Sequence, residues 1–136
     1  MKTLVIYYSY TGHTAALAKV LAAVESADIA EIRDAVRPAT FKAYTSGCFA
    51  ALRGKTWPIQ PLDVDLAAYD RLILMSPVWA GNTPPAVNAL LEQLPEGKSV
   101  SVKMVSGSGH SGCKNRLETI IKAKGGTLDA FEDIKA

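Results

Sequence analysis

Residues 4–14 of the chain read LVIYYSYTGHT. The first four of them form an apolar, β-prone run. Leu17, Leu21 and Val24 follow at the spacing of one helix face. The pattern predicts a strand that leads directly into a helix, with a short polar turn between the two.

The same strand and helix unit recurs twice along the chain. The apolar runs Leu72–Met75 and Val100–Val105 each precede leucine and isoleucine residues at helical spacing. Alternation of this kind predicts right-handed crossovers and a parallel sheet, and therefore an α/β fold. Asp28–Ile32 and Thr127–Ile134 instead alternate polar and apolar side chains, which is typical of strands at the edges of a sheet.

A single domain is predicted over residues 1–136, because no linker or composition shift divides the chain. The segment Asp34–Asp65 is the hardest to assign, since three prolines and two glycines interrupt its periodicity. Only a short helix around Phe49–Arg53 is predicted within it.

The composition excludes several functional classes. A net charge of +2 on 136 residues gives no reason to expect a nucleic acid or an anionic membrane as partner. No apolar run approaches the roughly 18 residues that span a bilayer. The two cysteines, Cys48 and Cys113, suit a reducing compartment, so a cytoplasmic protein is expected. The two histidines lack the cysteine and carboxylate neighbours of a metal site, and no spacing indicates hydrolase chemistry.

The turn after the first strand has the chemistry of an anion site. Ser9, Thr11 and Thr14 bring three hydroxyl groups to the start of the expected helix, and Gly12 permits a tight turn there. Peptide N–H groups converge at this positive end of the helix dipole, which favours a phosphate. The lysine of a nucleoside-triphosphate P-loop is absent. The alternative interpretation is that serine and threonine simply cap the helix.

A second loop, Pro77–Asn82, reads PVWAGN and follows a central strand. It should lie at the same edge of the sheet as the first loop, where open α/β sheets bind ligands. Trp79 offers an aromatic face to a planar ligand, and Gly81 adds backbone freedom beside it. Alternatively, the tryptophan is a half-buried residue at the edge of the core.

A third loop, Ser106–Gly112, reads SGSGHSG and carries glycines at G-x-G-x-x-G spacing after a strand. Glu132 and Asp133 follow about 20 residues later, as a dinucleotide site requires. A nicotinamide site therefore competes with other interpretations of this loop. Against it, a dinucleotide-binding fold needs further strand and helix units, and only one strand remains before the end of the sequence.

Residues 9–14 resemble the phosphate loop of the flavodoxin family, whose pattern Ser/Thr-x-Thr-Gly-x-Thr they match at every fixed position. Residues 69–81 resemble the strand and loop that pack against the flavin ring in that family, and residues 106–112 would form the other wall. The resemblance implies a flavodoxin-like, doubly wound five-stranded parallel sheet in the order 2-1-3-4-5, with helices on both faces. It also implies one non-covalently bound FMN, with a peptide at Ala80 or Gly81 turned toward the flavin N5. The cofactor-binding residues that it assigns are Ser9, Tyr10, Thr11, Gly12, His13, Thr14, Pro77, Val78, Trp79, Ala80, Gly81, Asn82, Ser106, Gly107, Ser108, Gly109 and His110.

The function that the resemblance implies is electron transfer through FMN to or from a redox partner protein or a small-molecule acceptor. A small NAD(P)H-dependent quinone or flavin reductase of the same fold is the alternative, and a binding module is a third hypothesis. Flavodoxin carriers are typically strongly acidic, whereas this chain is slightly basic, so steering toward basic reductases is not expected. The segment 33–55 holds cations that form either a solvated face or a docking face for an acidic partner. They are Arg33, Arg37, Lys42, Arg53 and Lys55.

Overall fold

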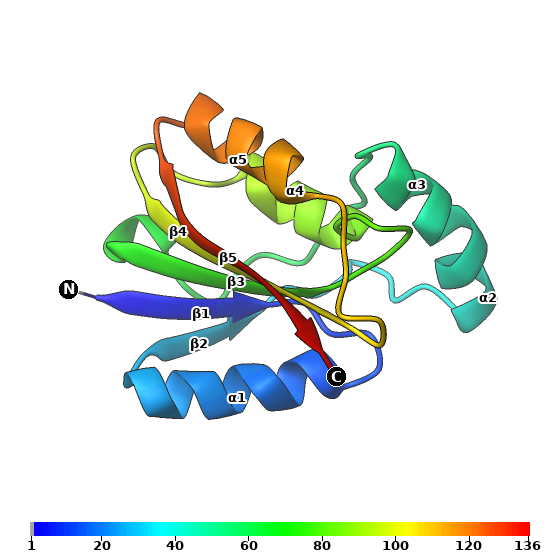
Figure 1. Cartoon of the computed structure of the whole chain (residues 1–136), viewed down its shortest axis with the longest axis horizontal. Helices are drawn as coiled ribbons and strands as arrows, with labels where there is room; N and C mark the ends of the chain where they lie inside the picture. Colours follow the sequence, from blue (N-terminus) through cyan, green and yellow to red (C-terminus); the bar gives the residue numbers. More distant parts are fainter. Residues whose placement is uncertain (1) are drawn as a thin grey trace.

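The computed structural model describes residues 2–136, apart from the side chains at positions 41 and 44, and shows a parallel five-stranded sheet (Figure 1). The strands are β1 (Thr3–Tyr7), β2 (Asp28–Glu31), β3 (Arg71–Pro77), β4 (Ser99–Ser106) and β5 (Thr127–Lys135). Their order is β2-β1-β3-β4-β5, which confirms the predicted topology. All carboxyl ends therefore meet at one edge of the sheet.

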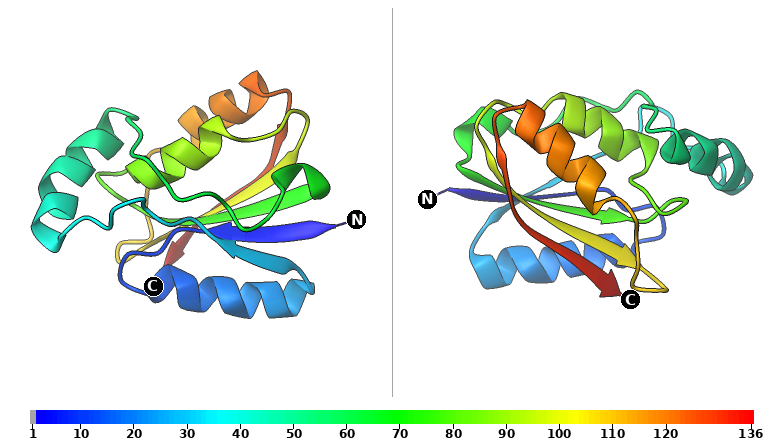
Figure 2. Two further views of the ribbon diagram at one scale, coloured as in Figure 1. Left: turned by 180° about the vertical axis from the view of Figure 1, so that it is seen from behind. Right: turned by 45° about the horizontal axis from the view of Figure 1, so that its top comes forward.

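Helices cover both faces of this sheet, as predicted (Figures 1 and 2). The helix α1 (His13–Glu25) lies on one face, and α4 (Pro85–Glu92) and α5 (Lys114–Ala123) lie on the other. A 3-10 turn, η2 (Leu66–Ala68), precedes β3. None of the helices within residues 2–136 is long and apolar enough to cross a membrane.

The core lies on both sides of the central strands. Leu4 and Ile6 of β1 and Leu72 and Leu74 of β3 pack under α4 and α5, while Val5, Ile73 and their neighbours pack under α1. Each of these side chains is almost fully buried. Burial on both faces explains why these strands are continuous apolar runs, and β2 and β5 alternate because they lie at the edges.

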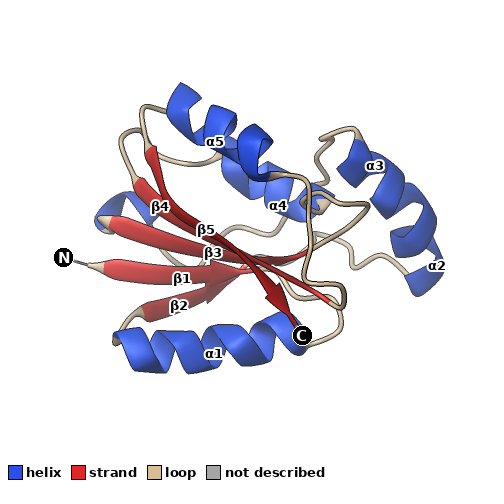
Figure 3. Cartoon of the chain, in the orientation of Figure 1, coloured by secondary structure: helices blue, strands red, loops and turns tan. Residues whose placement is uncertain are grey.

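Residues 40–52 form a nearly continuous helical arm beyond the carboxyl edge of the sheet (Figures 1 and 3). It consists of α2 (Thr40–Lys42), the π-helical turn η1 (Ala43–Gly47) and α3 (Cys48–Leu52). The short helix predicted around residues 49–53 is the last part of this arm. The rest escaped prediction because a π-helical turn breaks the 3.6-residue periodicity and because Gly47 argues against a helix interior.

Candidate functional site

Three loops meet at the carboxyl edge of the sheet, after the adjacent strands β1, β3 and β4. A cavity of about 470 Å³ opens between the first loop, the second loop and the helical arm. A smaller cavity of about 210 Å³ lies between the first, second and third loops. Thr11, Thr14, Pro77 and Val78 line both cavities, so the two are neighbours in one cleft.

The first loop presents its hydroxyl groups without capping the helix that follows. Gly12 is the N-cap of α1 with φ of 101°, and it makes no side-chain cap hydrogen bond. Instead, its own N–H donates to Ser9 Oγ at 3.0 Å, which folds the loop back on itself. The first-turn amides of α1 have no partner within the helix, and no acidic residue lies in that turn. The capping interpretation is therefore not supported, and the helix end is left available to an anion.

The second loop is a tight turn held by two reciprocal backbone hydrogen bonds. Trp79 N–H donates to Asn82 O at 2.9 Å, and Asn82 N–H donates to Trp79 O at 3.0 Å. The two central residues, Ala80 and Gly81, have φ of 51° and 76°, which defines a type I′ turn. Gly81 O also accepts a hydrogen bond of 2.9 Å from the N–H of Gly112, so the second and third loops are joined directly.

Trp79 lines the larger cavity and belongs to an aromatic cluster. The rings of Tyr8 and Tyr10 meet it edge to face, with centroids 6.0 and 5.9 Å away. The helical arm closes over it at Gly47, where an added Cβ would lie 2.6 Å from the indole Cζ3. The tryptophan is half-buried and packs against the edge of the core, and it also lines the cavity. A role toward a planar ligand stays a prediction.

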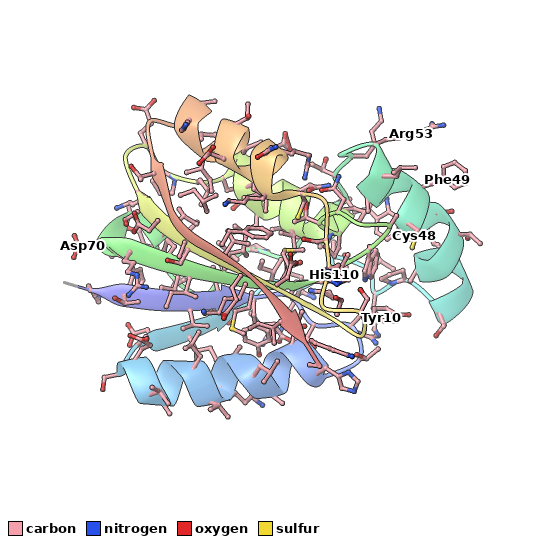
Figure 4. The ribbon with its side chains drawn as sticks, viewed as in Figure 1. Tyr10, Cys48, Phe49, Arg53, Asp70 and His110 are labelled. Carbon is pink, nitrogen blue, oxygen red and sulfur yellow. The ribbon has the colours of Figure 1, made fainter. Side chains whose placement is uncertain are left out.

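The helical arm supplies three cavity residues that the sequence did not reveal. Thr40, Ala43 and Cys48 line the larger cavity together with Trp79. Figure 4 shows Cys48 on the side of the arm nearest the sheet, at the same end of the molecule as Tyr10 and His110. No motif marks these residues, because the segment that holds them has no regular periodicity.

A partly buried network of hydrogen bonds holds the second loop against α5, α4 and the arm. Arg116 of α5 donates to Asn82 Oδ1 at 2.8 Å, to Thr83 Oγ1 at 2.9 Å and to Asn88 Oδ1 at 3.0 Å. Asn82 Nδ2 in turn donates to the carbonyl of Ala51 in the arm, at 3.0 Å. Burial lowers the pKa of Arg116, and no carboxylate of the described residues pairs with it. The arginine therefore serves as a hydrogen-bonding hub that joins α5, α4, the second loop and the arm.

A second buried pair lies beside the first loop. Tyr8 Oη donates to Asp34 Oδ2 at 2.6 Å, while Asp34 Oδ1 is buried with no hydrogen-bond partner in the described part of the chain. Burial raises the pKa of Asp34, although the hydrogen bond from Tyr8 and the charge of Arg37 oppose this shift. Burial and the bond to Asp34 likewise raise the pKa of Tyr8 far above its ordinary range. Burial therefore favours the neutral form of both the Asp34 carboxyl and the Tyr8 hydroxyl.

The predicted site residues fall into two groups. Those that line one of the two cavities are Tyr10, Thr11, His13, Thr14, Pro77, Val78, Trp79, Ala80, Ser106 and Gly107. Those in the same three loops but outside the linings are Ser9, Gly12, Gly81, Asn82, Ser108, Gly109 and His110. In the second group, Ser9, Gly81 and Asn82 hold the loops in shape through the hydrogen bonds described above. No cluster of metal-ligating side chains occurs within the described residues.

Comparison with known proteins assigns the family. The flavodoxin family model matches residues 2–128. The chain belongs to the flavodoxin family. No curated protein matches this flavodoxin-family chain significantly.

Solved structures share the flavodoxin fold of this chain. A flavoprotein from Lactobacillus acidophilus, solved in complex with FMN, is 21% identical with a TM-score of 0.74, over 96% of this chain and 91% of that one. A protein from Bacteroides eggerthii assigned as a flavoprotein is 22% identical with a TM-score of 0.81, over 96% and 86%. A flavodoxin from the domain Archaea is 17% identical with a TM-score of 0.58, over 99% and 85%.

Proposed function

We propose that this flavodoxin-family chain binds one FMN non-covalently in the cleft between its three loops and transfers electrons through it. The observation that carries the proposal is the uncapped N-terminus of α1, which opens between the hydroxyls of Thr11 and Thr14 onto a cavity of about 470 Å³. The Lactobacillus acidophilus flavoprotein of the same fold was solved with FMN. The free thiols of Cys48 and Cys113 suit a cytoplasmic location.

The cleft has the two chemical environments that FMN requires. The first loop offers hydroxyls and helix-terminal N–H groups to the dianionic phosphate, with no acidic side chain in the first turn of α1. The larger cavity offers Tyr10, Val78 and Trp79 to the apolar face of the ring. Its volume falls in the range of about 300 to 1,000 Å³ typical of small-molecule sites.

Bound FMN would supply one-electron and two-electron redox chemistry, and the carbonyls of the second loop would be the groups that accept a hydrogen bond from an N–H of the ring. Gly81 O is engaged by Gly112 N–H, whereas Ala80 O has no hydrogen-bond partner among residues 2–136. The free carbonyl of Ala80 supports Ala80 over Gly81 as the acceptor of a hydrogen bond from a ligand N–H.

The third loop favours a flavin over a nicotinamide dinucleotide. In a dinucleotide site an acidic side chain binds the ribose. Here Glu132 forms an ion pair with Lys103 at 2.8 Å, and Asp133 accepts a hydrogen bond of 2.7 Å from Ser111. Both acidic side chains are thus engaged with the protein itself. This arrangement supports an electron carrier over a nicotinamide-dependent reductase.

The experiment that tests this proposal separates a carrier from a reductase. Protein loaded with FMN is reduced photochemically without oxygen and mixed with ferricyanide, and a second sample receives NADPH with menadione. We expect rapid one-electron reoxidation in the first sample and no NADPH oxidation above that of free FMN in the second. Rapid NADPH oxidation would instead show that the protein is a reductase. If the bound FMN could not be reduced, the proposal of electron transfer would be refuted.

A further inference from the structure

The charge of this chain is distributed unevenly. Residues 33–55 contain five lysine and arginine side chains and a single carboxylate, a net charge of +4. Because the whole chain carries +2, the remaining residues together carry −2. The positive charge is therefore concentrated in the segment that forms the helical arm and its two connections.

Most of these cations have no acidic partner. Of the five, only Arg33 forms an ion pair among the described side chains, with Glu31 at 2.8 Å and Asp63 at 3.5 Å. Arg37 lies over the ring of Tyr10, 4.2 Å from its centroid. The others are Lys42, Arg53 and Lys55, all exposed. Unpaired exposed cations on one segment create a positive potential that extends into solvent.

Large apolar side chains accompany Arg53 on the outer side of the arm. Phe49 and Leu52, one helical turn apart in α3, are 62% and 63% exposed. The guanidinium of Arg53 lies 5.4 Å from the centroid of the Phe49 ring. Figure 4 shows Phe49 and Arg53 directed away from the body of the molecule. The main chain folds back onto α3 at Lys55, whose backbone N–H donates to Ala50 O at 2.8 Å.

The inner side of the same arm forms a wall of the cofactor cleft. Cys48, the neighbour of Phe49 in sequence, lines the larger cavity. Ala51 is fully buried, and its carbonyl is bonded to Asn82 of the second loop. A macromolecule that covers the outer side of α3 is therefore separated from the cleft by the thickness of one helix.

We propose that Phe49, Leu52, Arg53 and Lys55 form a docking surface, the basic arm surface, for an acidic electron-transfer protein. The proposal rests on the proposed function, because it places that partner beside the bound FMN. The apolar pair supplies contact area that is buried on docking, and the cations steer an acidic partner and orient it. A second copy of this chain is the less suitable occupant, because a symmetric pairing would bring like charges together.

The test uses holo-protein with FMN and two redox proteins of opposite charge, an acidic plant-type [2Fe–2S] ferredoxin and the basic cytochrome c. Calorimetric titration measures docking, and stopped-flow spectroscopy measures electron transfer from reduced ferredoxin to the bound flavin. We compare the wild-type protein with the double variant Arg53→Glu/Lys55→Glu and with Phe49→Ala. The matched control is Lys19→Glu/Lys122→Glu, which makes the same change of charge on α1 and α5.

We expect the ferredoxin to dock and cytochrome c not to dock, with an association rate that falls as salt is added. Arg53→Glu/Lys55→Glu should slow association about tenfold or more at low salt and remove most of the salt dependence. Phe49→Ala should weaken docking while keeping the salt dependence, and the control should change the rate less than about twofold.

Three outcomes would overturn the proposal: equal docking of the two redox proteins, equal loss of rate in the arm variant and the control, or self-association that Phe49→Ala abolishes. The docking titration is repeated with the apo-protein, because calorimetric detection of docking needs no bound flavin. If the protein binds FMN and the bound FMN can be reduced, but ferredoxin does not dock, the basic arm surface is refuted and the proposed function is not. Failure to bind FMN refutes the proposed function, and the apo-protein titration still decides the docking surface.

Discussion

Ala80 is the residue at which the backbone of the site is most constrained. Within residues 2–136 it is one of two non-glycine residues with positive φ, the other being Ser26, which ends α1 with a left-handed C-cap. A left-handed conformation costs an alanine about 1 to 2 kcal/mol. The type I′ turn holds Ala80 there through the paired hydrogen bonds of Trp79 and Asn82. Strain of this kind is often concentrated at functional sites.

Replacing Ala80 with glycine should relieve that strain. We expect Ala80→Gly to raise the free energy of unfolding of the apo-protein by up to about 1 kcal/mol, because the greater flexibility of glycine in the unfolded chain offsets part of the gain. Urea unfolding followed by circular dichroism measures the change. Ala16→Gly, an exposed position inside α1, is the control and should lower stability by about 1 kcal/mol. Equal destabilisation by both changes would show that Ala80 is not strained.

The buried carboxyl of Asp34 should make stability depend on pH. Burial raises its pKa in the folded protein, so the folded state binds the proton more tightly than the unfolded state does. Stability from this group is complete below the unfolded pKa and is lost as the pH rises through the folded pKa. Asp34→Asn cannot ionise and should remove this loss. Urea unfolding at a series of pH values should show a flatter profile for the variant, and an unchanged profile would contradict this assignment.

Among the structural elements, the helical arm depends on the absence of a side chain at Gly47. Its φ of −66° is helical, so propensity alone predicts that alanine would stabilise the arm by about 1 kcal/mol. However, an added Cβ would lie 2.6 Å from Trp79 Cζ3 and 3.3 Å from Trp57 Cη2. We expect the clash to dominate, with Gly47→Ala costing about 1 to 3 kcal/mol in urea unfolding and weakening FMN binding. A more stable variant would show that the arm does not rest on the indole ring.

Arg116 should connect α5 energetically to the second loop. Arg116→Met removes three donors and leaves the buried oxygens of Thr83 and Asn88 without that partner. We expect a loss of about 2 to 4 kcal/mol in the free energy of unfolding, together with weaker FMN binding. Arg33→Met is the control, because its ion pairs are on the surface and should contribute less than about 1 kcal/mol. If Arg116→Met lowered the free energy of unfolding no more than Arg33→Met, Arg116 would not be a hub of the network.

At the scale of the whole molecule, the sheet could be predicted from the sequence because its strands differ in burial. The central strands β1 and β3 are buried on both faces and are continuous apolar runs, while β2 and β5 alternate because one face is partly solvated. Short periodic patterns carry such information directly. The convergence of the three loops also followed, since the carboxyl ends of parallel strands share one edge.

The helical arm and the polar network could not be predicted, because both depend on contacts between residues far apart in sequence. Gly47 looks like a helix breaker until Trp79 is seen to lie against it. Arg116 looks like any exposed cation of an amphipathic helix until Asn82, 34 positions away, accepts its hydrogen bond. Likewise, the serine and threonine residues of the first loop suggest a capped helix. The start of α1 is uncapped because the chain places Gly12 at the N-cap position.

The most direct measurement of the central claim is a calorimetric titration of the apo-protein with FMN and, separately, with riboflavin. If the first loop holds the phosphate, FMN should bind with a stoichiometry of one and at least about tenfold more tightly than riboflavin. Thr14→Val, which keeps the side-chain volume of this buried residue, should narrow that difference. Equal affinity for FMN and riboflavin, or binding of neither, would contradict a phosphate site at the start of α1.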